Sequence, residues 1–337
     1  MLSIVHFVVS CDRDHILGKI HQFAFLVPNL KQLAYEVFVK MSKRAIRYAV
    51  VDAFTKEAFK GNPAAVCLLG DIADVDDHWM QSVAKEFNVS ATAFLSPVIS
   101  ATGTDGQDDS SSIPRFNVRW FTPGAEVPLC GHATLATAHF LFSTDVAKHD
   151  TIEFVSKSGL LVARKIIRTT LKQETFTVEL DFPLDPVVEC DTSQVPSIPL
   201  TLNGVPIVKV VKTTACDDLI VELPSGKDVA KLQPNFGEIK QCAGRGIIVT
   251  GPAPDGCGFD FFTRFFCPKI GINEDPVCGS IHCALVPYWC EKLKRKSLTS
   301  FMASERSGVL HLELDEESHR VRISGEAVTV MEGTILV

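Results

Sequence analysis

The sequence predicts an α+β protein made of two related halves, and three observations support that prediction. The motif Glu-x-Pro-aliphatic-Cys-Gly-polar occurs twice, at residues 126–132 and 274–280. Each copy follows an Arg-aromatic-Phe-x-Pro segment, which begins at Arg119 and at Arg264, and each precedes an apolar run typical of a buried helix. Few helical patterns separate the strand-like segments, so a regular alternation of strands and helices is excluded. A unit of strand, turn and helix has therefore been duplicated.

The strands of the first half are predicted by runs of apolar, β-branched and aromatic residues. They cover residues 46–54, 64–69, 89–95, 116–121, 151–155, 160–167 and 175–182. An N-cap at Asp76 or Asp77 begins a helix that Asn88 ends. Residues 100–114 hold almost nothing to bury and predict a surface loop. Residues 132–142 are apolar or small nearly all round, which predicts a helix enclosed by protein.

The second half shows the same kinds of segment in a similar order. Strands are expected at residues 207–211, 218–223, 246–250, 259–266, 309–314, 321–323 and 327–337. The last strand is expected to turn at Glu332 and Gly333. A short helix is expected at residues 228–232 and a buried one at 280–290. Pro287 removes one backbone hydrogen bond from the buried helix and should kink or shorten it.

Composition along the chain predicts an extension followed by two lobes. Residues 1–40 differ from the rest and lack the features of a signal peptide, so we expect them to be disordered or an artefact of the gene model. The N-terminal lobe is expected at residues 41–186 and the C-terminal lobe at 187–337, with a proline-containing crossing at 183–186. The last strand is free to return to the N-terminal lobe.

Overall composition narrows the class of protein. The chain has 337 residues with 46% apolar content, enough for one large or two modest cores. A net charge of −7 and the absence of a basic, aromatic-rich patch argue against nucleic acid as a partner. Eleven cysteines without a Cys-x-x-Cys pair indicate a reducing cytoplasm rather than a disulfide framework or a zinc site. No run approaches the ~18 apolar residues that span a membrane.

The duplicated Cys-Gly step has chemistry of its own. Glycine at a helix start lets a ligand approach the backbone, and the N–H groups there attract a carboxylate. A cysteine at the same place has its thiolate favoured by the helix dipole, which lowers its pKa. If the halves are related by a pseudo-twofold axis, Cys130 and Cys278 face one small ligand from opposite sides. One thiolate would then remove a proton beside a carboxylate, and the other thiol would return it from behind. The alternative is a pair of ordinary buried cysteines.

Several further segments carry a resemblance to a known family. They are the segment 51–54, the segment 59–66 (Phe-Lys-Gly-Asn-Pro-Ala-Ala-Val), Phe-Thr-Pro at 121–123, Cys-Gly-His-Ala-Thr at 130–134, and the copy at 274–280. Together they resemble the PhzF-like (phenazine biosynthesis-like) family from about Arg47 to the C-terminus. The resemblance implies the diaminopimelate-epimerase-like fold, with two lobes that each wrap a mixed sheet around a central helix. It also implies an isomerase of small carboxylate substrates that needs no metal or organic cofactor and is often a homodimer.

The resemblance also implies roles for particular residues. His132, Asp275 and Ser280 match the family's polar active-site residues, while Gly131 and Gly279 match the amides that hold the substrate carboxylate. Each polar residue has a plainer alternative, because Asp275 could cap a helix, Ser280 could fill space, and His132 could be a structural histidine.

Three departures from the family pattern affect the functional prediction. The family reads Asn-x-Ser-Glu-Thr-x-Phe with glutamate as proton shuttle, whereas this chain has Ala91 at that position and Glu86 only on the preceding helix. Many members carry threonine in place of Cys278, so the chain is closer to two-cysteine racemases and epimerases that share the fold. Residues 302–308 fit the family's Gln-x-Ser-x-Arg-Gly-Gly only loosely.

We therefore expect an isomerase, most simply an amino-acid racemase or epimerase that uses Cys130 and Cys278 as an acid/base pair. Its substrate would be a small carboxylate or amino acid. One alternative is a dihydro-hydroxyanthranilate-type isomerase, which Ala91 disfavours. Another is a pseudoenzyme that has kept the fold and lost the proton shuttle. A nucleotide-binding enzyme is disfavoured because neither Gly-x-Gly-x-x-Gly nor a P-loop is present.

Overall fold

The computed structural model describes residues 45–70, 75–98, 113–144, 146–169, 174–190, 198–242 and 244–336. Residues 47–333 form one compact unit. The predictions for residues 1–40 and for nearly all of the loop at 100–114 lie outside the described residues. No helix in the described ranges is long and apolar enough to span a membrane.

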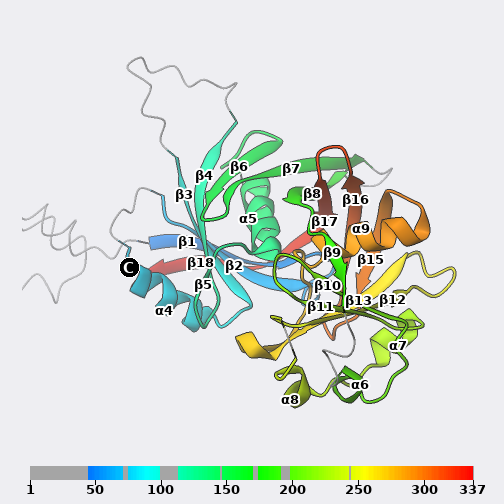
Figure 1. The fold of residues 1–337 in the computed structure, drawn as a ribbon. Helices are drawn as coiled ribbons and strands as arrows, with labels where there is room; N and C mark the ends of the chain where they lie inside the picture. Colours follow the sequence, from blue (N-terminus) through cyan, green and yellow to red (C-terminus); the bar gives the residue numbers. More distant parts are fainter. Residues whose placement is uncertain are drawn as a thin grey trace, which may run out of the picture. The chain divides into compact units, whose positions relative to one another are not determined.

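The described residues of the first half form two α-helices and nine strands in the order that the sequence predicts, with two short strands added (Figure 1). In chain order they are β1 (Ala45–Ala53), β2 (Asn62–Leu68), α4 (Asp77–Phe87), β3 (Ala91–Pro97), β4 (Arg115–Phe121), β5 (Glu126–Val127), α5 (Gly131–Ser143), β6 (Thr151–Ser156), β7 (Gly159–Thr169), β8 (Glu174–Pro183) and β9 (Val187–Glu189). Asp76 caps α4 by accepting from the N–H of Trp79, and Asn88 ends it in the left-handed conformation, as predicted.

In the second half, the residues that the structure describes form four α-helices, a 3₁₀ helix and nine strands. They are α6 (Ile198–Thr201), β10 (Lys209–Thr213), β11 (Leu219–Glu222), α7 (Gly226–Lys231), α8 (Phe236–Ile239), β12 (Ile247–Pro252), β13 (Phe261–Cys267), η2 (Pro268–Ile270), β14 (Ile272–Asp275), α9 (His282–Leu293), β15 (Ser297–Met302), β16 (Gly308–Asp315), β17 (Arg320–Gly325) and β18 (Ala327–Leu336).

The strands join in one mixed sheet whose pairing pattern is repeated in the two halves. Paired strands follow one another in the order β9, β10, β11, β12, β13, β15, β16, β17, β8, β7, β6, β4, β3, β2, β1. In the first half β2 and β3 are parallel, β3 and β4 antiparallel, and β4 and β6 parallel. In the second half β11 and β12, β12 and β13, and β13 and β15 repeat that pattern. The duplicated sequence motif is thus part of a duplicated topology. The two copies of this topology are joined where β8 pairs with β17.

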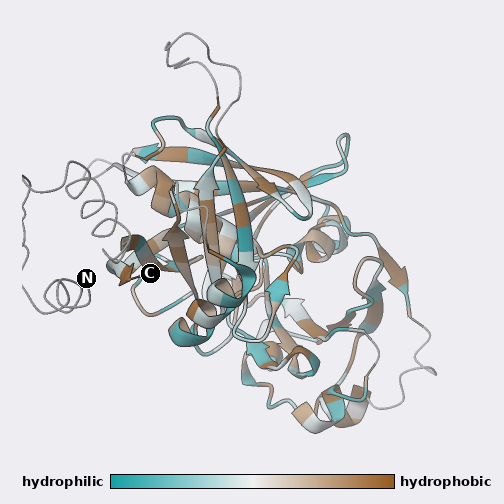
Figure 2. Ribbon diagram, turned by 90° about the vertical axis from the view of Figure 1, so that its left-hand side faces the viewer, coloured by the Kyte–Doolittle hydropathy of each residue, from teal (hydrophilic) through white to brown (hydrophobic). Residues whose placement is uncertain are grey.

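The two long buried helices supply much of the core. Helix α5 packs against β2, β3, β7 and β8, and α9 packs against β15, β16 and β17 (Figure 1). Every residue of α5 from Gly131 to Ala138 is buried, which confirms the prediction of an enclosed helix. Figure 2 shows hydrophobic residues along the strands. The buried hydrophobic residues form two clusters, and the smaller cluster lies within residues 198–266.

Several sequence predictions were wrong or incomplete. The short strands β5, β9 and β14 were missed, as were β15, α6 and α8, because two to six residues carry little periodicity. The turn expected at Glu332 and Gly333 is absent, since β18 runs through both residues. Gly333 serves close packing instead, because a Cβ there would lie 2.8 Å from Cε1 of Tyr48. Helix α9 also continues past Pro287 to Leu293 and is not shortened.

Candidate active site

The two motif copies adopt the same hairpin, closed by the same ion pair. Nε and Nη2 of Arg119 on β4 donate to the two carboxylate oxygens of Glu126 on β5, both at 2.8 Å. Nε and Nη2 of Arg264 on β13 donate to Glu274 on β14 at 2.7 and 2.9 Å. Two-pronged pairs of this kind fix geometry as well as energy. The repeated Arg and Glu therefore have a structural role, which is to fix the hairpin that leads into each Cys-Gly turn.

The two Cys-Gly turns lie against each other. A Cβ built on Gly131 would lie 3.5 Å from Cα of Gly279 and 3.6 Å from N of Ser280. A Cβ on Gly279 would lie 3.7 Å from Cα of Gly131 and 3.4 Å from the ring of Phe54. These are ordinary contact distances, and neither glycine has the positive φ that excludes other residues. Packing therefore does not demand glycine at either position, and close approach of a ligand to the backbone remains as the physical reason for it.

Each cysteine contacts the polar residue two positions further along the chain. The half-buried Cys130 is the N-cap residue of α5, and its Sγ lies 3.5 Å from Nδ1 of His132. The buried Cys278 has its Sγ 3.4 Å from Oγ of Ser280. Both sulfurs also receive a backbone N–H from a helix start, that of Ala133 in one copy and that of Ile281 in the other. The structure thus brings together four of the residues that the sequence selected.

A side chain four residues after each cysteine holds that cysteine's carbonyl oxygen. Thr134 Oγ1 donates to O of Cys130 at 2.7 Å, and Nδ1 of His282 lies 2.9 Å from O of Cys278. Because a carbonyl only accepts, Nδ1 of His282 carries the proton, and Nε2 accepts from Oγ of Ser300 at 2.9 Å. Burial lowers the pKa of His282 to about 4, so its ring is neutral. Sequence reasoning missed Thr134 and His282, although their common spacing from the two cysteines would have found them.

Asp275 at the end of β14 links the two copies. Its Oδ1 accepts from Nδ2 of Asn62 on β2 at 2.7 Å, so a residue of the first half holds a carboxylate of the second. The negative charge of Asp275 raises the pKa of both the Cys130 and the Cys278 thiols and opposes the burial that lowers the pKa of His132. Asp275 therefore does not merely cap a helix, because it acts electrostatically on both cysteines.

The expected lowering of the cysteine pKa values is not what the structure gives. Burial is the largest influence on both thiols, and it raises the pKa of Cys130 to about 12 and that of Cys278 well above its usual range. Asp275 adds to this rise, whereas the helix N–H groups and, at Cys278, the Arg245 guanidinium oppose it. The backbone N–H groups at the helix starts thus act in the predicted direction, but desolvation outweighs them.

Ala91, which stands where the family has its glutamate, is fully buried at the start of β3 and belongs to the larger hydrophobic core. Glu86 is exposed on α4 and belongs to no such core. The side chain at position 91 therefore offers packing and no proton transfer.

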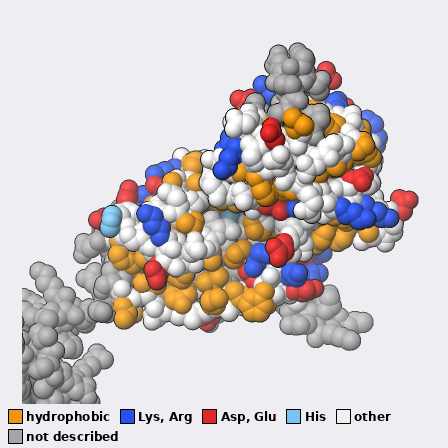
Figure 3. Space-filling model, turned by 90° about the horizontal axis from the view of Figure 1, so that it is seen from below, with side chains coloured by type: hydrophobic (Ala, Val, Ile, Leu, Met, Phe, Trp, Pro, Cys, Tyr) orange, Lys and Arg blue, Asp and Glu red, His pale blue; other side chains and the backbone are white. Residues whose placement is uncertain are grey.

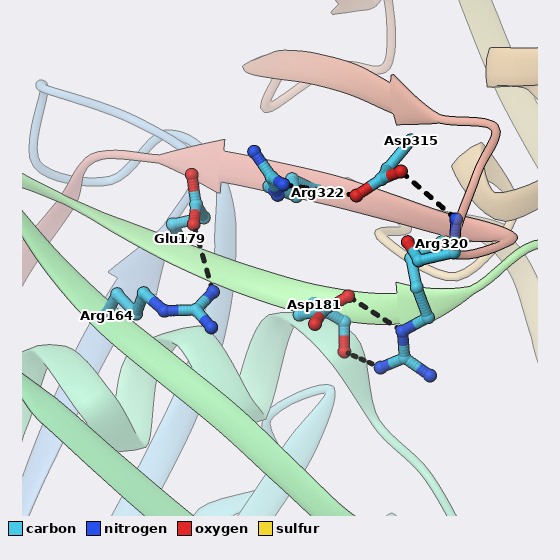
Figure 4. Close-up of a pocket in the computed structure, with 7 residues that line it drawn as sticks. Arg164, Glu179, Asp181, Asp315, Arg320 and Arg322 are labelled. Atoms are coloured by element: carbon cyan, nitrogen blue, oxygen red, sulfur yellow. Dashed lines mark hydrogen bonds and ion pairs between the residues drawn. The ribbon is translucent and has the colours of Figure 1, made fainter.

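Two cavities of the described surface lie away from the two Cys-Gly turns. One of about 310 Å³ lies over β7, β8, β16 and β17, and another of about 540 Å³ adjoins it. Figure 4 shows the first, where Arg164 pairs with Glu179, Arg320 with Asp181 and Arg322 with Asp315. These pairs join neighbouring strands and leave little unbalanced charge. On the face shown in Figure 3, positive and negative side chains are likewise interspersed. No group of three or more His, Cys, Asp or Glu side chains in the described parts of the chain is placed to hold a metal ion.

Comparison with known proteins gives a consistent result. A family described as "Phenazine biosynthesis-like protein" matches residues 51–333. An uncharacterized isomerase of Halalkalibacterium halodurans is 42% identical over 289 residues, covering 85% of this chain and 97% of that protein. The mouse phenazine biosynthesis-like domain-containing protein 2 is 39% identical over 297 residues, with coverage of 85% and 97%.

Solved structures extend the likeness to the fold. A PhzF family protein of Enterococcus faecalis superposes with a TM-score of 0.70 at 36% identity, covering 87% of this chain and all of that chain. A hydroxyproline epimerase from Agrobacterium vitis, solved with trans-4-hydroxy-L-proline bound, gives a TM-score of 0.52 at 12% identity, with coverage of 88% and 93%. At that identity the likeness concerns the fold alone.

Proposed function

Because the chain belongs to the phenazine biosynthesis-like (PhzC-PhzF) family, whose relatives at about 40% identity are named isomerases, we propose that it is a cofactor-independent isomerase. The substrate class we propose is amino acids, and the reaction is racemisation or epimerisation at Cα. Cys130 and Cys278 would be the acid/base pair.

One observation carries this proposal: two Cys-Gly turns, each at the start of a buried helix, lie in backbone contact at Gly131 and Gly279. A single such turn would suit many roles. Two of them, related by the repeat and placed against each other, present two thiols and two sets of helix N–H groups to one small molecule. That arrangement suits proton removal and return at one carbon.

The proposed steps follow from these groups. The substrate carboxylate accepts from the N–H groups at the two helix starts, which also stabilise the enolate-like charge as it develops. One cysteine, as thiolate, takes the proton from Cα, and the thiol of the other gives a proton to the opposite face. The enzyme is left with its two sulfur protonation states exchanged. Thr134 and His282 hold the peptide groups that carry the cysteines and do not exchange protons with substrate.

Asp275 suggests how a buried thiol becomes a base. Its charge raises the pKa of both thiols, so it opposes formation of either thiolate. An amino acid brings an ammonium group that would pair with Asp275 and cancel much of that effect. Substrate binding would therefore activate the thiols, and the thiols would remain protonated at other times.

The same residues distinguish between the alternative functions. A single-carboxylate 1,3-proton shift of the dihydro-hydroxyanthranilate type lacks its base, because Ala91 is buried in the core. A pseudoenzyme would explain the loss of that glutamate but not the retention of two matched cysteines beside Asp275. A homodimeric state and a cytoplasmic location remain predictions of the family resemblance and the cysteine content.

The direct test is solvent deuterium incorporation at Cα, measured by mass spectrometry across a panel of amino acids. Wild type is compared with Cys130→Ser, Cys278→Ser and the control Cys290→Ser, which changes another buried cysteine of α9. We expect exchange in wild type and in Cys290→Ser, and a loss of at least 100-fold in the other two. Exchange that survives both substitutions would refute the assignment of the bases, and no exchange in a folded wild type would favour the pseudoenzyme.

A further inference from the structure

The peptide group that precedes Cys278 is held at both ends. Its carbonyl, which belongs to Val277, accepts from Nδ2 of Asn62 on β2 at 2.9 Å. Its N–H, which belongs to Cys278, donates to Sδ of Met302 at 3.0 Å. Because a peptide group is planar, fixing both ends also fixes the position of the Cys278 Cα. The proposed steps assign no role to Met302.

Met302 is well placed to hold a backbone group. It is the last residue of β15 and fully buried, and its backbone pairs with Thr263 on β13 and with Gly308 on β16. A methionine side chain is flexible, but close packing in the core restricts it. The thioether sulfur is a weak acceptor, and it is the one that the Cys278 N–H finds among the described residues.

The segment 302–308 holds the second motif copy at another point, and the first half repeats that contact. Oγ of Ser304 donates to O of Pro276 at 2.6 Å. Oγ of Ser158 donates to O of Pro128 at 2.8 Å. Proline is the third residue of each motif copy, so the two serines are counterparts. The repeat thus includes the segments that follow β15 and β6, and these can be compared residue by residue.

Met302 and its counterpart in the first half differ. The parallel pairing of β15 with β13 and of β6 with β4 makes Ser156 the equivalent of Met302. Oγ of Ser156 donates to O of Gly159 at 2.8 Å and not to the motif. The peptide group before Cys130 has no hydrogen-bond partner in the part of the chain that the structure describes. The repeat therefore supplies a side chain that holds the N–H of Cys278 and none that holds the N–H of Cys130.

We propose that Met302 is a positioning residue for the reaction, because its sulfur fixes the direction from which the Cys278 thiol meets the substrate. This rests on the proposed function, in which Cys278 is one of the two bases. It goes beyond that function by giving the two cysteines different supports. Met302 acts through Cys278 and touches no substrate, so its loss should slow proton transfer and leave substrate binding nearly unchanged.

Met302→Leu tests the proposal, because it removes the acceptor at nearly constant volume. Met302→Gln supplies a new acceptor on a side chain of similar length, and glutamine is the residue of the family pattern at this position. Met80→Leu is the control, since it changes a buried methionine of α4. Steady-state kinetics on the best amino-acid substrate compare the three variants with wild type, and thermal melts check that they are folded.

We expect kcat to fall by roughly 10- to 100-fold in Met302→Leu, because displacing a reacting group by about 1 Å costs a factor of this size. KM should stay within about threefold of wild type, since the contact does not bind substrate. Met302→Gln should be at least about fivefold faster than Met302→Leu, the effect of regaining one hydrogen bond. Met80→Leu should behave as wild type.

A second measurement follows the N–H itself and needs no turnover. Protein labelled with ¹⁵N-cysteine gives amide signals from its cysteines alone, and the signal lost in Cys278→Ser identifies Cys278. We expect this amide to exchange with solvent about 2- to 10-fold faster in Met302→Leu, the factor for one lost neutral hydrogen bond, and to regain protection in Met302→Gln. The signals of the other cysteines show any general loss of stability.

Wild-type kcat in a folded Met302→Leu would overturn the proposal. So would a Met302→Gln variant as slow as Met302→Leu, since packing and not the acceptor would then matter. If Met302→Leu does not fold, norleucine in place of all five methionines removes the sulfur, and Met302→Gln made in the same way is its control. An absence of Cα exchange in wild type would reject the racemase. The amide measurement would then decide whether Met302 holds Cys278, with an unchanged exchange rate in Met302→Leu as the contrary result.

Discussion

At the scale of residues, burial shifts the pKa values of the predicted site. It raises the pKa of the two cysteines and lowers that of His132. Cys130, Cys278, Gly131 and Gly279 could be selected from sequence because the motif occurs twice. The resemblance to the family added His132, Asp275 and Ser280. The role of Asn62 could not be predicted, because a buried amide is recognised by its partners and those partners are more than 200 residues away in the chain. The direction of the cysteine pKa shifts also escaped prediction, since it depends on how much water the fold excludes.

The raised thiol pKa values predict an unusual pH dependence. Activity needs one thiolate, so raising the pKa moves the rising limb of the rate toward alkaline pH. The profile of kcat/KM reports the free enzyme, and its limb should lie above pH 9. The limb of kcat reports the complex and should lie at lower pH, because the substrate ammonium offsets Asp275. Initial rates from pH 6 to 11 on the best substrate check this, and coincident limbs would contradict substrate activation.

Asp275→Asn separates the two effects of this carboxylate. Removing its charge should lower the pKa of both thiols, so iodoacetamide should alkylate Cys130 and Cys278 several-fold faster at pH 9. Catalysis on amino acids should nevertheless fall by at least tenfold, because the ammonium loses its partner. Peptide mass spectrometry follows the alkylation, with the exposed Asp217→Asn as control. Unchanged alkylation would show that Asp275 does not act on the thiols.

The two glycines between the turns provide a test of function against packing. Gly131→Ala and Gly279→Ala meet nothing closer than 3.4 Å, so the free energy of unfolding should change by less than about 1 kcal/mol. The added methyl groups would occupy the space between the turns, so KM should rise by tenfold or more. Gly325→Ala is the contrasting variant, because its Cβ would lie 2.5 Å from the ring of Phe54 and should cost about 1–3 kcal/mol. Urea titrations and steady-state kinetics measure both quantities, and large destabilisation by Gly131→Ala would return that residue to a packing role.

At the scale of elements, the hairpins β4–β5 and β13–β14 explain why Arg and Glu belong to the motif. The sequence predicted β4 and β13 correctly, since each has seven residues with a clear pattern. It missed β5 and β14, which have only two and four residues and are joined to β4 and β13 by the ion pair across each hairpin. Arg264 has a further task, because its Nη1 donates to O of Leu232 at 2.6 Å at the end of α7.

Arg264→Met and Arg119→Met should therefore differ although they occupy equivalent positions. Arg264 is the more buried, and its loss leaves Glu274 and the Leu232 carbonyl without partners, at a cost of about 3–5 kcal/mol. Arg119 is more exposed, and Lys157 still pairs with Glu126 at 2.5 Å, so its loss should cost about half as much or less. Urea denaturation gives both values, and equal losses would show that burial of the pair is not decisive.

At the scale of the whole molecule, the duplication could be predicted from the sequence. The pairing of β8 with β17, which joins the two halves, could not. The repeated motif predicts two equivalent sets of strands. The parallel pairing of β2 with β3 and of β11 with β12 confirms that prediction. Nothing in the periodicity of β8 or β17 says that they pair with each other. Such a choice depends on complementary edges, here including Asp181 beside Arg320, and not on a pattern within either strand.

The partly buried His139 and the buried His282 should make the folded state sensitive to acid. Burial lowers the pKa of His139 and of His282 to about 4, below their value near 6.5 in the unfolded chain. Between pH 6.5 and 4 the unfolded state binds more protons, so stability falls as the pH falls, by about 1.4 kcal/mol per pH unit for each histidine. His139→Gln should reduce the slope of the unfolding free energy against pH by about 1.4 kcal/mol per pH unit, the contribution of one proton. Urea denaturation between pH 4.5 and 7.5 checks this, and an unchanged slope would mean that the pKa of His139 is not lowered in the folded state.

The pairing of β8 with β17 has a consequence for synthesis of the chain on the ribosome. Residues 174–183 emerge from the ribosome well before their partner at 320–325. The edge of β8 that pairs with β17 therefore stays unpaired while roughly 140 further residues are translated. Glu179 and Asp181 give that edge a negative charge that discourages pairing with other nascent chains, and β17 arrives with Arg320 and Arg322. The charges that join the two halves in the finished protein thus also protect the first half until the second is complete.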